Sequence, residues 1–123
     1  APSRPYNVTK TSTYFKAHHN EDDGETDLSY NTSADLAQAT GFQRINGIVN
    51  DNDGSGCGTL QLFDPSSTTF VKHFSARLMG TNDNSSDYYI AGYNNVTAAI
   101  DGVQFKMSAG TIDAGTITLY GIS

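Results

Sequence analysis

The spacing of strand-like runs is the feature that most constrains this fold. Short runs rich in β-branched and aromatic residues, which suit a pleated surface, alternate with turn residues about every 8 to 12 positions. No stretch carries the apolar spacing of a long amphipathic helix. The pattern predicts an all-β chain, a single-domain antiparallel β-sandwich or jelly roll of about eight short strands.

The strand candidates differ in how their faces are composed. In the longest one, Phe74 and Ala76 share an apolar face that Lys72 interrupts, so we place that end at the rim. Residues 88–93 carry aromatic side chains on both faces, which predicts a second sheet on one side and a subunit or loop on the other. The strand candidates are residues 10–17, 28–30, 59–63, 69–79, 88–93, 98–100, 103–107 and 116–122.

The last third of the chain has the clearest alternation. Apolar Val103, Phe105 and Met107 alternate with polar residues, and a Gly-containing link then leads to a second run in which Ile117 and Leu119 share one face. This pattern predicts a β-hairpin over residues 103–122.

The connections between the strands are predicted from their turn residues. Asn46 and Gly47 suit a type I′ turn, so either a tight hairpin forms there or a strand carries a bulge. Residues 34–38 could form one helical turn at most, and residues 80–87 read as a polar loop. Asp64, Pro65 and the two serines that follow predict a turn in which a Ser side chain bonds the local backbone.

The amino-terminal residues 1–9 differ from the rest. Their two prolines resist helix and favour extended backbone, so we expect an extended arm that docks on a neighbour or, equally, a frayed terminus. Residues 10–123 form the predicted β-sandwich domain. Hydrophobic residues are 37% of the chain, below the usual ~45 to 50%, which favours stability gained by oligomerisation.

The charge and the apolar content of the chain limit which kinds of partner it can have. Thirteen acidic against seven basic side chains give a net charge of −6, which repels phosphate backbones and anionic lipid, so we expect neither nucleic acid nor membrane as a partner. No apolar run reaches the ~20 residues of a membrane helix, and no signal peptide opens the sequence. If Ala1 follows a removed initiator Met, this predicts a protein made in the cytoplasm, and a matured precursor is the alternative.

Residues for covalent chemistry are sparse. The chain has one cysteine, Cys57, between glycines, and no Gly-x-Ser-x-Gly elbow, so we predict no enzyme, no catalytic residue and no bound cofactor. The absence of Trp lowers the expectation of a sugar site, although seven Tyr residues could replace it.

An acidic stretch after two histidines is the one candidate for a cation. We favour a solvated loop and predict no metal, because adjacent histidines on a strand point to opposite faces and no Cys or His spacing matches a zinc site. A cation site stays the alternative. The residues concerned are His18, His19, Glu21, Asp22, Asp23, Glu25 and Asp27.

Four segments taken together resemble known proteins. They are Leu60-Gln-Leu-Phe-Asp-Pro-Ser-Ser-Thr-Thr-Phe-Val-Lys-His-Phe74, Tyr89-Ile-Ala-Gly-Tyr-Asn-Asn95, Val103-Gln-Phe-Lys-Met-Ser-Ala-Gly110 and Gly115-Thr-Ile-Thr-Leu-Tyr-Gly-Ile122. As a set they resemble small virion structural proteins of tailed bacteriophages, over residues 60–123. The resemblance implies a β-sandwich or jelly-roll component of the particle, and within that class we favour a capsid cement, or decoration, protein.

The resemblance also implies partners and a location. A cement protein binds the outside of the head, ties neighbouring copies of the major capsid protein together and self-associates, here as an expected homotrimer at the virion surface. In the arm, Arg4, Pro5 and Tyr6 are the candidate contact residues for the shell, with Arg4 able to pair a carboxylate. The alternative is a tail-associated or receptor-binding module that recognises host surface glycan through Tyr-rich loops such as residues 88–95.

Overall fold

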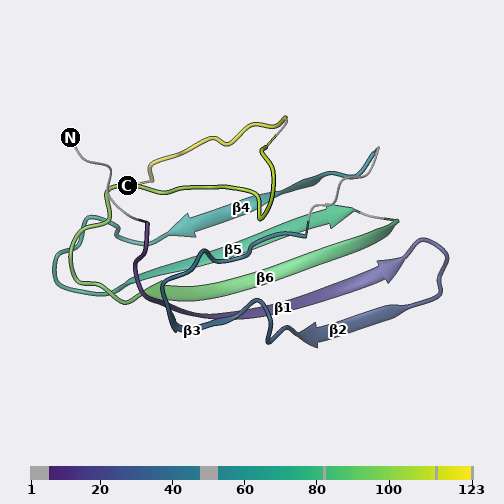
Figure 1. Cartoon of the computed structure of the whole chain (residues 1–123), viewed down its shortest axis with the longest axis horizontal. Coiled ribbons are helices and arrows are strands. Elements are labelled where there is room, and N and C mark those ends of the chain that lie inside the picture. The colour runs from purple at the N-terminus through teal and green to yellow at the C-terminus, as the bar shows by residue number, and fades with distance from the viewer. Residues whose placement is uncertain (1–5, 48–52, 82, 113, 123) are drawn as a thin grey trace.

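Two long strands form the centre of the sheet in the computed structural model, which describes residues 6–47, 53–81, 83–112 and 114–122 (Figure 1). β1 (Lys10–Asn20) and β6 (Asn84–Asn94) pair antiparallel along their whole length, from Lys10 opposite Asn94 to Asn20 opposite Asn84. Both strands contain the aromatic and β-branched residues that favour a pleated surface.

Shorter strands complete the sheet on both sides of this pair. The strand order is β2-β1-β6-β5-β4, all pairs are antiparallel, and β3 shares with β2 the outer side of β1. The outer strands are β2 (Thr26–Tyr30), β3 (Leu36–Ala39), β4 (Gly56–Leu62) and β5 (Lys72–Thr81).

The predicted all-β, antiparallel character is confirmed, and the predicted strands at residues 10–17, 28–30, 59–63, 69–79 and 88–93 coincide with β1, β2, β4, β5 and β6. The described residues form one sheet of six strands rather than two sheets with eight. They include no helix that is long and apolar enough to cross a bilayer.

Three local predictions were wrong. Residues 36–39 form a strand, β3, where one helical turn was the expectation. The expected polar loop at residues 80–87 is a tight hairpin, because β5 continues to Thr81 and β6 begins at Asn84, with Asp83 at a positive φ of 56°. Residues 42–47 form neither hairpin nor bulge, and residues 48 and 49 lie outside the described part of the chain.

The turn at Asp64 is confirmed. The Ser67 N–H donates to the Asp64 carbonyl at 3.1 Å, and the Ser67 hydroxyl oxygen accepts from the backbone N–H of Thr69 at 3.2 Å and of Phe70 at 3.1 Å. The short side chain therefore replaces backbone partners that the turn cannot supply.

One face of the sheet carries the core, and we call it the covered face. It is built from alternate residues of the three central strands, in which Phe74 lies opposite Gly92 and Ala76 opposite Ile90. The buried apolar residues are Tyr14, Ala34, Phe74, Ala76, Tyr88 and Ile90, with Ile45, Leu62 and Leu78 packed against them.

The segment from residue 31 to residue 47 covers this face, as Figure 1 shows where the chain crosses the sheet after β3. Ala34 and Ile45 supply its apolar contacts with the core. Gln43 fixes it to β1, because Gln43 accepts from the Ser12 hydroxyl and donates to the Ala34 carbonyl at 2.9 Å. A loop therefore takes the place of the second sheet predicted on this side.

Lys72 is buried, with 1% of its surface exposed, so its predicted place at the rim was wrong. Its ammonium group donates to the carbonyls of Phe70 at 2.9 Å, Val96 at 3.0 Å and Thr97 at 2.9 Å. Three acceptors offset the cost of removing the charge from water. The residue thereby fixes the chain that follows β6 to the start of β5.

The predicted hairpin over residues 103–122 was also wrong. No strand follows Asn94 in the described residues, and residues 98–100, where a short element was expected, form a bend and irregular chain. Figure 1 shows the green-to-yellow C-terminal segment, residues 101–112 and 114–122, looping out on the β4 side of the sheet. Its alternating residues have the pattern of strands but form no ladder with any other described residue.

Candidate functional site

The sheet face opposite the core is the first candidate site, and we call it the open face. The strand register places one row of side chains across five strands on this face, in an order that runs from β2 to β4. The row consists of Tyr30, Phe15, Tyr89, Arg77 and Thr59. Its members come from distant parts of the sequence, and only the strand pairing brings them together.

Phe15 and Tyr89 form the centre of the row. Their rings stack with centroids 4.8 Å apart and planes 8° from parallel. The Arg77 guanidinium carbon lies over the Tyr89 ring, 5.1 Å from the ring centroid. Stacked rings with a cation beside them form a flat amphipathic platform suited to binding.

The Asp87 carboxylate connects two residues of this platform, Arg77 and Tyr89, by hydrogen bonds. The Arg77 guanidinium donates to this carboxylate twice, at 3.1 and 2.9 Å, and the Tyr89 hydroxyl donates to it at 2.9 Å. The hydrogen bonds from Arg77 hold the pKa of Asp87 below its ordinary value, while the bond to Asp87 raises the pKa of Tyr89. The Asp87 carboxylate is therefore charged at neutral pH, and the three hydrogen bonds hold it in one orientation.

A shallow depression of about 360 Å³ adjoins the platform. Hydroxyl and amide side chains from β1, β4 and β5 surround the aromatic floor, so the surface offers both apolar and hydrogen-bonding contacts. Its lining includes Thr13, Phe15, Gln61, Ser75, Arg77 and Tyr89.

The C-terminal segment is the second candidate site. Its first part is anchored, since the Ile100 N–H donates to the Pro65 carbonyl at 2.8 Å and the Lys106 ammonium lies 4.0 Å from the Phe42 ring centroid. Beyond it, residues 114–122 make no hydrogen bond, ion pair or ring contact with any other described residue. Leu119 is 93% exposed and Ile122 is 88% exposed.

The predicted arm is only partly described. Arg4 and Pro5 lie outside the described residues. Tyr6 is half-exposed, and its ring lies against Gly102, where an added Cβ would be 3.4 Å from Tyr6 Cε1. The candidate contact through Arg4, Pro5 and Tyr6 stays a prediction.

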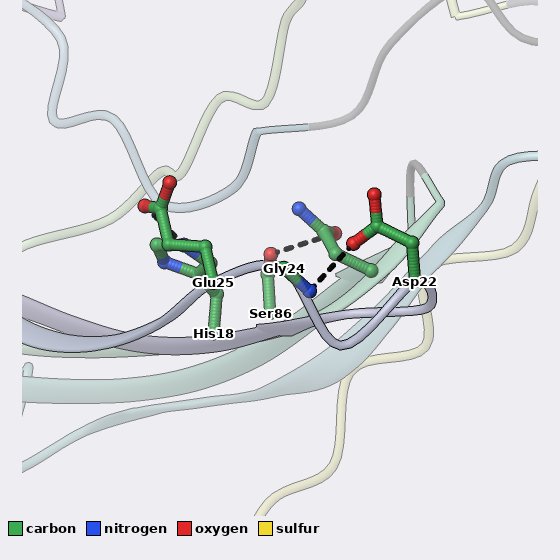
Figure 2. A network of polar contacts seen from close by, with 6 residues as sticks. His18, Asp22, Gly24, Glu25 and Ser86 are labelled. Carbon is green, nitrogen blue, oxygen red and sulfur yellow. Dashed lines mark hydrogen bonds and ion pairs between the residues drawn. The ribbon is translucent and has the colours of Figure 1, made fainter.

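The acidic stretch forms the turn between β1 and β2 (Figure 2). His18 Nε2 is 3.0 Å from Glu25 Oε1, and His19 Nε2 is 3.0 Å from Asp23 Oδ1, so each histidine takes a different acid. Asp22 accepts from the Gly24 N–H at 2.8 Å. These acids therefore shape a turn, and no three His, Cys, Asp or Glu side chains of the described residues are grouped as metal ligands.

The proposed glycan loop at residues 88–95 does not exist as a loop, because most of it is the central strand β6. Tyr88 is buried in the core, whereas Tyr89 lies on the open face and Tyr93 is half-buried, 6.1 Å from the His73 ring. The alternation of these tyrosines is readable from the sequence, whereas the strand pairing that puts Tyr89 beside Phe15 and Arg77 is not. Cys57 is a free, exposed thiol on β4.

Comparisons with known protein families, curated proteins and solved structures find no match to this chain. The class of the protein therefore rests on the structure alone: an all-β protein with one antiparallel sheet of six strands among the described residues.

Proposed function

We propose that this chain is a non-enzymatic structural protein of a tailed-phage particle, a cement or decoration protein that binds the outside of the head and stabilises the capsid lattice. One observation carries the assembly role: among the described residues, sixteen large apolar side chains are exposed and six apolar residues are buried. Exposed apolar surface on this scale is typical of chains that work inside an assembly, where partners cover it.

The location in a phage head rests on the resemblance of residues 60–123 to virion structural proteins. In this proposal the partners are the major capsid protein and further copies of the chain, as a homotrimer at the virion surface. The sandwich arrangement then arises by assembly, when the open faces of packed copies supply the second layer that one copy lacks. Arg4, Pro5 and Tyr6 of the arm reach the shell.

The mechanism of this proposed function is linkage. Each subunit bound across neighbouring capsid proteins favours the lattice that it fits over the lattice without it, by the free energy of that binding. No bond is made or broken, so stability depends on contact area and on the number of copies bound.

Particle composition tests the proposal. In purified particles that contain this chain, quantitative mass spectrometry should give a copy number comparable with that of the major capsid protein. The purified chain should also bind emptied, expanded heads and raise the temperature at which they lose integrity. A copy number comparable with that of tail proteins, together with no binding to heads, would refute the head location.

The platform on the open face favours a second candidate function, recognition of a host surface glycan by a tail-associated module. The stacked Phe15 and Tyr89 rings offer a flat apolar surface for a sugar ring, and Arg77 and Asp87 offer charged hydrogen-bonding groups beside it. Glycan-array binding that is lost in Tyr89→Ala and kept in Phe70→Ala would support this candidate over the cement role.

A further inference from the structure

Residues 116–122, which we call the tail, have the sequence of a strand but pair with no strand among the described residues. Its sequence alternates Thr116, Thr118 and Tyr120 with Ile117 and Leu119, the pattern of a strand that is apolar on one face. In the structure it has no ladder and Leu119 is almost wholly exposed. An extended apolar segment with unpaired N–H and C=O groups is well suited to adding itself to the edge of a sheet.

The two edges of the sheet differ in how they are protected. β2 carries Asp27 and follows the acidic turn, and such charges discourage edge-to-edge pairing. β4 reads Gly-Cys-Gly-Thr-Leu-Gln-Leu, with no charge and no proline, and among the described residues it pairs only with β5. The edge open to strand addition is therefore β4.

The tail and β4 also match in length and in the face on which their apolar side chains lie. The tail has the seven residues of β4. On β4, Leu60 and Leu62 lie opposite Ala76 and Phe74 on the covered face. A strand added beyond β4 can place Ile117 and Leu119 beside these leucines and so extend the core by two more apolar side chains.

We propose that the tail of one copy adds as a strand to the β4 edge of a second copy of this chain. Tail and edge are different surfaces, so the contact is heterologous, and repeated around an axis it closes into a ring. A threefold ring satisfies every tail and every β4 edge. This inference deepens the self-association of the proposed function and rests on that part of it.

Two co-expressed chains distinguish exchange between copies from pairing within one. The first keeps Cys57 as its only cysteine. The second carries Cys57→Ser with one new cysteine in the tail, in separate variants at Thr116, Thr118 and Tyr120, and a tag that changes its mass. A disulfide needs Cα atoms about 4.4 to 6.8 Å apart, so only a tail strand lying against β4 brings the two cysteines within reach.

After mild oxidation we expect a reducible heterodimer of the two chains with at least one tail position. The matched control places the new cysteine at Thr26, on the β2 edge, and should give no heterodimer. A link from Thr26 in place of the tail would overturn the proposal in favour of edge-to-edge contact.

Pairing within one chain is the other outcome that would overturn it. A single chain holding both Cys57 and Thr118→Cys would then form an intrachain disulfide while the co-expressed pair stays unlinked. An oligomer without any link at the three tail positions also refutes tail exchange but leaves the proposed function standing, whereas a chain that stays monomeric counts against both.

Discussion

Phe15 and Tyr89 lie directly opposite each other in the pairing of β1 with β6, and their rings stack on the open face at 4.8 Å. The register of these two strands, rather than either strand alone, creates the platform. A shift of one residue would turn Tyr89 into the core and expose Tyr88. The same register that buries the core thus sets out the open face.

Phe74, on β5, should contribute more to the stability of the fold than Phe70, which precedes that strand. Phe74 is buried over Gly92, whereas Phe70 is 70% exposed. Phe74→Ala should lower the free energy of unfolding by about 3 to 5 kcal/mol, and Phe70→Ala by less than about 1 kcal/mol. Urea unfolding followed by tyrosine fluorescence measures both. Equal losses of stability in the two variants would mean that the core has been assigned to the wrong face of the sheet.

Lys72 should be essential to the fold despite its charge. Lys72→Met keeps most of the volume but leaves three carbonyls without their donor, so we expect a loss of about 3 kcal/mol or more. Lys16→Met, at a half-buried position within β1, should change stability little. Calorimetry compares the two variants, and an unchanged melting temperature for Lys72→Met would contradict its role.

Replacing Tyr14 with Phe should stabilise the fold. Its hydroxyl is buried and has no hydrogen-bond partner among the described residues. Tyr14→Phe removes that cost, so the free energy of unfolding should rise by about 1 kcal/mol. Tyr30→Phe is the control, because it loses a bond to Asp35 and should gain nothing. A destabilised Tyr14→Phe would mean that the hydroxyl has a partner.

The same burial raises the pKa of Tyr14 to about 12, with desolvation as the main cause. The neutral phenol is therefore favoured in the folded state, and one tyrosine should titrate well after the exposed ones in an absorbance titration of the folded protein.

Acid should weaken the fold in part through Asp87. Arg77 holds the pKa of Asp87 below its ordinary value of 3.8, so its contribution is present above that pH and is lost as the pH falls through the lower, folded-state pKa. Urea midpoints measured from about pH 5 to about pH 2 should therefore fall less steeply in Asp87→Asn than in the unchanged chain or in Asp53→Asn. The same fall of the urea midpoint with pH in Asp87→Asn and in the unchanged chain would contradict the ion pair between Asp87 and Arg77.

The sequence was sufficient for the all-β, antiparallel character and for most central strands, because period-2 alternation and turn residues are local, but it did not predict the single sheet of six strands. It was insufficient where tertiary contacts decide. The sequence predicted Lys72 at the rim, but its ammonium group is buried against the nearby carbonyl of Phe70 and the distant carbonyls of Val96 and Thr97. Residues 103–122 have every local property of a hairpin, yet the part of them that the structure describes pairs with no strand of the sheet.

The candidate sites divide in the same way. The alternation of Arg77 with Phe74 and Ala76 was legible in the sequence, since neighbouring positions on a strand take opposite faces. The row that joins Arg77 to Tyr89 and Phe15 was not, because it depends on the order and register of three strands.

The mass of the chain in solution tests most directly the central claim that its exposed apolar surface serves assembly. Sedimentation equilibrium over a range of concentrations should give species heavier than the 13.2 kDa chain, approaching three times that mass as the concentration rises. A mass of 13.2 kDa at every concentration would contradict the account.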